Sequence, residues 1–134
     1  MKIIALIGPS GCGKTTTLSI VYNRLLANGG VSNNRQQLGA NPNDFSDIVN
    51  WQGKQVAFFS MGDYSGYLVN ATRYYRGLNI DTFVCACNDR FARPIYEFQN
   101  PVYNYIPIFK VREPNPALRA IADNNAAQTI YNLI

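Results

Sequence analysis

The spacing of hydrophobic residues changes early in the chain. Residues 2–7 are continuously apolar and rich in β-branched side chains, which is typical of a strand buried on both faces of a parallel sheet. From Thr15 onward the apolar residues recur at helical spacing, and Asn28-Gly29-Gly30 ends that pattern. The side chains that share the helical face are Leu18, Val21, Leu25 and Leu26. The chain is therefore expected to open with a strand, a loop and a helix.

The same reasoning predicts the remaining elements. Two apolar runs at 48–51 and 55–60 are separated by Gln52-Gly53, which favours a hairpin with a tight turn. The other segments expected are a helix at 68–78, strands at 82–87 and 101–111, and a helix at 117–134. We therefore expect one α/β domain, 1–134, with three layers. Its five-stranded sheet should be mostly parallel, with one antiparallel hairpin strand.

The composition limits the kinds of ligand and catalytic group that the protein can use. The chain has 12 basic and 8 acidic residues, and its net charge of +4 favours anionic partners, although no basic run indicates nucleic acid. The sequence contains no histidine, which excludes a histidine base, and its three cysteines supply too few ligands for zinc. Cys85 and Cys87 are expected in the core. The apolar start is too short for a signal sequence, and no stretch approaches the roughly 20 apolar residues of a membrane span, so a cytoplasmic protein is expected.

Residues 8–15, GPSGCGKT, occupy the loop between the first strand and the first helix. Glycines can adopt positive φ angles and let backbone N–H groups approach an anion, and a helix N-terminus adds further free N–H groups. In this setting Lys14 is expected to reach the β- and γ-phosphates of a nucleotide, and the Thr15 hydroxyl to bind Mg²⁺. The residues expected to bind the nucleotide are Gly8, Pro9, Ser10, Gly11, Cys12, Gly13, Lys14, Thr15 and Thr16.

This strand, loop and helix resemble the Walker A segment of P-loop NTPases, and the loop itself is very similar to that of ABC transporter ATPases. The chain has no LSGGQ-type signature, no histidine for a switch position and no apolar strand ending in Asp-Glu, so the likeness to that family is expected to stop at the loop. The element order instead resembles Ras-like GTPases, in which an Asp-x-x-Gly motif follows the hairpin. Asp63-Tyr64-Ser65-Gly66 has that form.

The resemblance to P-loop NTPases implies Mg²⁺ held by Thr15 and Asp63, with Lys14 and Asp63 as the catalytic residues. Asn88 matches the first position of the guanine-reading Asn-Lys-x-Asp motif, but the lysine and aspartate are missing, so ATP is expected and GTP less so. No Glu or Gln directly follows the Asp63-Tyr64-Ser65-Gly66 motif to act as a base. A slow Mg²⁺-dependent NTPase is expected, or one whose site a protein partner completes.

Two alternatives stay open. In a nucleotide or small-molecule kinase, Arg90 and Arg93 would clamp phosphates as a lid, and Asp44 or Asp47 would lie near the acceptor hydroxyl. In a GTPase-like, nucleotide-gated switch, the segment around Asp63 would move with the nucleotide and bind a partner. The aromatic contact surface of that switch would be formed by Tyr64, Tyr67 and Tyr74.

Overall fold

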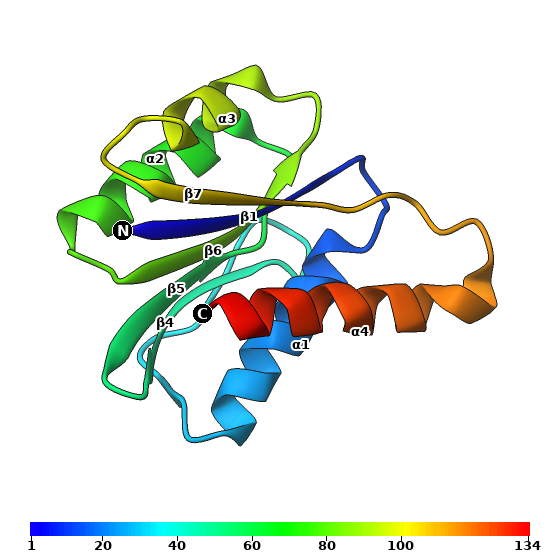
Figure 1. Ribbon diagram of the computed structural model, residues 1–134, viewed down its shortest axis with the longest axis horizontal. Coiled ribbons are helices and arrows are strands. Elements are labelled where there is room, and N and C mark those ends of the chain that lie inside the picture. Colours follow the sequence, from blue (N-terminus) through cyan, green and yellow to red (C-terminus); the bar gives the residue numbers. More distant parts are fainter.

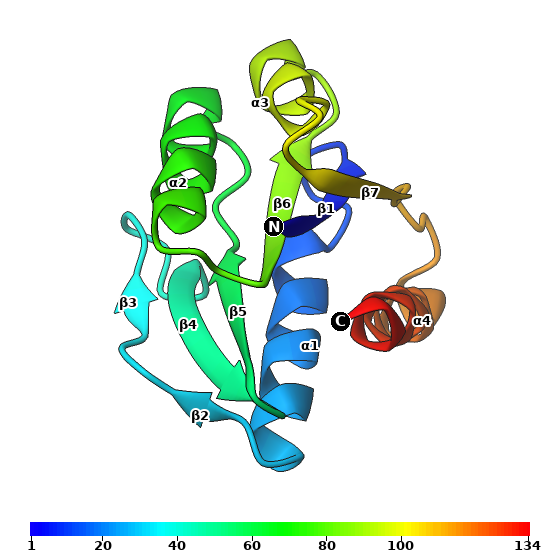
Figure 2. The same cartoon turned by 60° about the vertical axis from the view of Figure 1, so that its left-hand side comes forward.

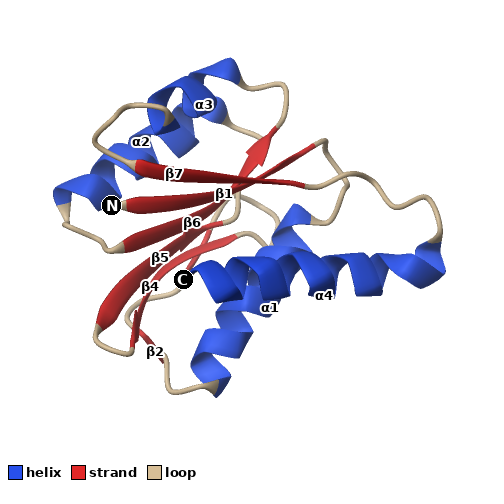
Figure 3. Cartoon of the chain, in the orientation of Figure 1, coloured by secondary structure: helices blue, strands red, loops and turns tan.

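A seven-stranded mixed sheet forms the centre of the molecule, with helices on both of its faces (Figures 1 and 3). The computed structural model describes residues 1–134. The strands are β1 (Lys2–Gly8), β2 (Val31–Ser32), β3 (Gln36–Gln37), β4 (Phe45–Trp51), β5 (Lys54–Phe59), β6 (Thr82–Asn88) and β7 (Asn104–Phe109). The helices are α1 (Lys14–Ala27), α2 (Ser65–Gly77), α3 (Ala92–Phe98) and α4 (Pro116–Leu133). The strand order is β2-β4-β5-β6-β1-β7, and β3 also pairs with β4.

The centre of the sheet is parallel and buried on both faces. β6 lies between β1 and β5 and runs parallel to both, and all of its residues are buried. Helices α1 and α4 cover one face and α2 and α3 cover the other, which explains why β1 and β6 are continuously apolar (Figure 2). Cys85 and Cys87 belong to the core on the α2 side, as expected, and burial raises the pKa of Cys87 to about 11.

The expectation of a mostly parallel, five-stranded sheet is wrong. β4 pairs antiparallel with β5, and β2 and β3 add two further antiparallel pairings on the outer side of β4. The Gln52-Gly53 turn is the predicted tight one, with φ angles of 50° and 75° at its two residues. β2 and β3 were not predicted because each is only two residues long and exposed, so neither carries a hydrophobic pattern.

The helices follow the predictions with one addition. Leu18, Val21 and Leu25 of α1 are completely buried, as the helical spacing predicted. α3 was not expected, because its seven residues include Pro94 and only Pro94 and Phe98 are buried. Pro107 lies in β7, which is an edge strand, where proline is tolerated because its missing N–H can face away from the sheet. None of the helices is both long and apolar enough to cross a membrane.

The topology brings four chain segments to one edge of the sheet. The parallel strands β1, β5 and β6 all end there, and Gly8 is in register with Asn88. β4 runs in the opposite direction, so it begins at this edge, where Ser46 pairs with Phe59. The loop before α1, the segment after β5, the end of β6 and the start of β4 therefore meet, and the candidate site lies among them.

Candidate functional site

The glycine loop, defined as residues 8–15, turns tightly between β1 and α1. Gly11 and Gly13 have φ angles of 75° and 93°, in the left-handed region that favours glycine. The N–H groups of Gly11 and Gly13 donate to no acceptor in the protein, and the first helical bond comes from Thr17 N to Gly13 O at 2.9 Å. The first N–H groups of α1 therefore also lack intrahelical partners. The loop presents a set of free backbone donors, which is the chemistry that binds an anion.

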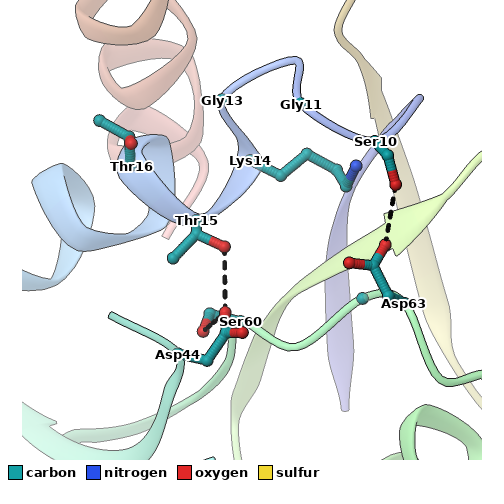
Figure 4. Close-up of a pocket in the computed structure, with 10 residues that line it drawn as sticks. Ser10, Gly11, Gly13, Lys14, Thr15, Thr16, Asp44, Ser60 and Asp63 are labelled. Carbon is teal, nitrogen blue, oxygen red and sulfur yellow. Dashed lines mark hydrogen bonds between the residues drawn. The ribbon is translucent and has the colours of Figure 1, made fainter. Parts of the chain in front are cut away.

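A pocket of about 320 Å³ lies against these donors (Figure 4). None of the residues that line it is hydrophobic. Most come from the loop and α1, and the others come from the start of β4 and the segment after β5. The lining residues are Ser10, Gly11, Gly13, Lys14, Thr15, Thr16, Asp44, Ser60, Gly62 and Asp63. Of the residues expected to bind the nucleotide, Gly8, Pro9 and Cys12 do not line this pocket.

Lys14 holds its ammonium group inside the loop. Its Nζ donates to the carbonyl oxygens of Gly8 at 2.9 Å and Pro9 at 2.8 Å, and the residue is only 7% exposed. An ammonium group has three donor hydrogens and carries a full positive charge. This places a buried cation beside the free N–H groups of the loop, where phosphate oxygens can replace the two carbonyls as acceptors.

Thr15 faces a carboxylate that the metal assignment from sequence did not include. Its Oγ1 donates to Asp44 Oδ1 at 3.1 Å, and Ser60 Oγ donates to the same oxygen at 3.1 Å (Figure 4). Ser60 is fixed in turn by accepting from the N–H of Phe45 at 2.8 Å. The signal that identifies Asp44 is the hairpin itself, because an antiparallel β4 must begin where β5 ends.

Asp63 lies on the opposite side of the pocket from Asp44 (Figure 4). Its Oδ1 accepts from Ser10 Oγ at 3.3 Å, and Ser10 Oγ also accepts from Asn88 Nδ2 at 3.4 Å. The structure therefore brings Asp63 into the pocket but bonds Thr15 to Asp44. The assignment of Asp63 to the metal stays a prediction.

The donor set near Thr15 fits a magnesium ion. Mg²⁺ takes oxygen ligands and is usually held by one or two protein groups together with waters and substrate phosphates. Thr15 Oγ1 and Asp44 Oδ1 are such a pair of oxygens and both face the pocket. No cluster of three or more His, Cys, Asp or Glu side chains is placed to hold a metal on its own. Any Mg²⁺ here would thus take its remaining ligands from water and from the phosphates of the nucleotide.

Of the residues named for a kinase, Asp44 lines the pocket, whereas Asp47, Arg90 and Arg93 do not. Asp47 is 3% exposed and accepts hydrogen bonds from Tyr22 OH at 2.8 Å and from the N–H groups of Asn34 and Ile48 at 3.0 and 2.7 Å. Asp47 therefore anchors the start of the hairpin and does not face the pocket. Arg90 and Arg93 do not line the pocket either; Arg90 precedes α3, and Arg93 lies in its first turn.

The side of the loop that faces α4 has its own set of charged groups, which the sequence did not reveal. Lys110 Nζ donates to Cys12 O at 2.7 Å and forms an ion pair with Asp123 of α4, also at 2.7 Å. Arg112 Nε donates to Ser10 O at 2.8 Å. A second pocket, of about 370 Å³, lies among these residues and shares Gly11, Gly13 and Thr16 with the first.

Comparison with known proteins gives one match. A family model described as ABC transporter matches residues 1–74, which include the glycine loop, α1, the β4–β5 hairpin and most of α2. No curated protein and no solved structure matches the chain. The expectation that this likeness stops at the loop is wrong, because the match continues through the hairpin that supplies Asp44 and Ser60.

Proposed function

The chain belongs to the ABC transporter family and is an ATP-binding P-loop protein, and on that premise we propose that it is a slow Mg²⁺-dependent ATPase. The observation that carries the proposal is the glycine loop. Its free N–H groups, its buried lysine and its threonine all border one polar pocket. The reaction would cleave the bond between the β- and γ-phosphates.

Each side chain of the pocket has a role that its position supports. The loop N–H groups and Lys14 bind phosphate oxygens and neutralise charge that develops on them during transfer. Thr15 and Asp44 supply two oxygens for Mg²⁺, and Asp63 and Ser10 close the far wall of the pocket. Bound Mg²⁺ would neutralise negative charge on the β- and γ-phosphates.

ATP is the proposed nucleotide. ATP binding follows from the family, whereas the guanine-reading motif is incomplete after β6. Asn88 is the one residue that matches this motif, and both polar atoms of its side-chain amide already have partners in the protein. Its Nδ2 donates to Ser10 Oγ at 3.4 Å, and its Oδ1 accepts from Arg90 N at 3.0 Å. An amide held in this way is not free to read a base.

Turnover should be slow because the pocket lacks a Glu or Gln to position or activate the attacking water, and its two carboxylates, Asp44 and Asp63, are engaged in hydrogen bonds with hydroxyl groups. Its lining contains no Glu, Gln, Arg or His. Gln52 is exposed at the turn between β4 and β5, at the end of these strands that lies far from the pocket. We expect the purified chain to release phosphate from Mg²⁺-ATP at well below about 1 per second, under the usual range for enzymes.

A phosphate-release assay checks this, with Lys14→Ala as the control for contaminating ATPases. Turnover of tens per second that Lys14→Ala abolishes would show that a catalytic group is present that the pocket does not reveal. A rate that rises when a partner protein is added would support completion of the site by that partner.

A nucleotide-gated switch is a second candidate, and one observation favours it. The backbone after β5 separates the phosphate pocket from an uncharged groove of about 580 Å³ beneath α2. Phe59 and Met61 line this groove, whereas Ser60 and Gly62 line the phosphate pocket. A change at the phosphates can therefore reach the groove through a single segment. Tyr64, Tyr67 and Tyr74 are each more than half exposed near it.

The switch is tested by limited proteolysis of residues 62–67. A non-hydrolysable ATP analogue with Mg²⁺ should slow cleavage of this segment, and ADP should not, since only the triphosphate places a γ-phosphate near Ser60 and Gly62. Equal protection by the two nucleotides would rule out a switch that responds to the γ-phosphate.

A further inference from the structure

Two basic side chains from the segment that follows β7 bind the glycine loop on the side that faces α4, away from the phosphate pocket. Arg112 Nε donates to Ser10 O at 2.8 Å, and Lys110 Nζ donates to Cys12 O at 2.7 Å. Both residues lie outside the segment that matches the family, 1–74. They connect the loop to the far end of the chain, close to α4.

These two carbonyls belong to the same peptide groups as the two free N–H donors. Ser10 C=O shares its peptide unit with Gly11 N–H, and Cys12 C=O shares its unit with Gly13 N–H. The C=O and N–H of a trans peptide point in opposite directions. The N–H of Gly11 therefore points away from Arg112, and that of Gly13 away from Lys110. Neither N–H has an acceptor in the protein.

The Lys110 contact is rigid. Lys110 is 7% exposed, and its ion pair with Asp123 of α4 is 2.7 Å long. A Cβ added at Gly13 would lie 2.5 Å from Asp123 Oδ1, so this carboxylate occupies the space that a side chain would need. The main chain of Lys110 also bonds the end of β1, with its N–H donating to Ile7 O at 2.8 Å. The loop is thus fixed on the side opposite the pocket.

We propose that Arg112 and Lys110 are positioning residues for phosphate binding, which they promote through the peptide groups of the loop without touching the ligand. Each cation fixes the plane of one peptide so that its N–H faces the pocket. Each also polarises that peptide, since a charge-assisted bond at the carbonyl makes the N–H at the other end a stronger donor. The inference rests on the proposed binding of phosphates at the loop.

Arg112 offers the cleaner test because it is exposed and its replacement should not unfold the protein. The probe is inorganic tripolyphosphate with Mg²⁺, which has no nucleoside to contact other residues. We expect Arg112→Met to weaken its binding about tenfold, because binding must then supply the ordering of the Ser10–Gly11 peptide that this charge-assisted hydrogen bond provides. Arg112→Lys should restore most of the affinity, since a lysine can also donate to Ser10 O.

Arg119→Met is the matched control. Arg119 is also exposed and lines the same second pocket, but its Nε donates to Glu113 O at 2.9 Å and not to the loop. The substitution Arg119→Met removes one positive charge from the same region, as Arg112→Met does, but leaves every hydrogen bond to the loop carbonyls in place. We expect its affinity for tripolyphosphate to stay close to that of the wild type.

Nuclear magnetic resonance spectra distinguish the orientation of a single loop peptide from a general electrostatic attraction of the phosphates. In Arg112→Met, the shift that Mg²⁺-tripolyphosphate produces in the Gly11 amide resonance should decrease, while that of Gly13 should not. In the double variant Lys110→Met/Asp123→Met, which removes the buried ion pair without leaving one charge unpaired, the Gly13 resonance should be the one affected.

Several outcomes would overturn the proposal. Equal weakening by Arg112→Met and Arg119→Met would show only a general electrostatic effect, and unchanged binding in Arg112→Met would show no effect at all. Either result leaves the proposed ATPase intact if the wild-type chain binds Mg²⁺-ATP. Failure of the wild-type chain to bind either Mg²⁺-ATP or Mg²⁺-tripolyphosphate would overturn both proposals.

Discussion

Replacing Lys14 with alanine should weaken Mg²⁺-ATP binding by about 100-fold or more, since it removes a buried cation that can make two charge-assisted bonds to phosphate oxygens. The ammonium group lies inside the loop, where it donates to the main-chain carbonyls of Gly8 and Pro9 and, at 4.0 Å, to Cys12 Sγ. Water can hydrogen bond to these carbonyls when the lysine side chain is removed, so the fold should survive. Isothermal titration calorimetry with Mg²⁺-ATP measures the loss directly.

Lys14→Arg is the matched variant for charge. The guanidinium keeps the positive charge but is larger and planar, and the site that Lys14 occupies is almost fully enclosed by the loop. We expect Lys14→Arg to bind more weakly than the wild type as well. Affinities within about twofold of the wild type for both variants would mean that the ammonium group does not reach the phosphates.

Asp44→Asn should remove most of the Mg²⁺ dependence of ATP binding, whereas Asp63→Asn should leave most of it in place. The reason is geometric, because Asp44 shares a hydrogen bond with Thr15 and Asp63 shares one with Ser10 across the pocket. We expect Asp44→Asn to lower affinity in the presence of Mg²⁺ by about tenfold, since one charged ligand is lost. Affinity measured with excess chelator should change little.

Calorimetric titrations with and without Mg²⁺ give the comparison. Each asparagine keeps the size of the aspartate that it replaces and one acceptor oxygen, and it removes the negative charge. The reverse pattern would be loss of the Mg²⁺ dependence in Asp63→Asn and its retention in Asp44→Asn. That result would support Thr15 and Asp63 as the metal ligands, as the sequence indicated. Equal losses in both variants would place the two carboxylates around the same ion.

The glycine loop could be predicted because its chemistry is local. Strand, glycines, lysine and helix follow one another within residues 2–27, and the structure places them as predicted. The pairing of Thr15 with Asp44 could not be predicted in the same way, since it depends on which end of β4 lies beside β5. The hairpin was visible in the sequence, but its consequence for Asp44 requires the antiparallel register of Ser46 with Phe59.

The contacts that α4 and the segment after β7 make around the glycine loop could not be predicted from the sequence either. Lys110, Arg112 and Asp123 lie about a hundred residues from the loop, and no motif marks them. Their contacts arise because β7 pairs with β1 and α4 packs against α1, which brings the end of the chain beneath Ser10 and Cys12. The short strands β2 and β3 were missed for a different reason, since two exposed residues have no periodicity to detect.

The most direct test of the central claim is the thermal stability of the wild-type chain with Mg²⁺ and ATP, compared with ADP, GTP and GDP. A ligand at about 100 times its dissociation constant should stabilise the fold by roughly 2.7 kcal/mol, which is a readily measured shift in Tm. We expect ATP to give the largest shift and Lys14→Ala to abolish it. No shift with any nucleotide, at concentrations that saturate ordinary nucleotide sites, would contradict the assignment of the glycine loop as a phosphate-binding site.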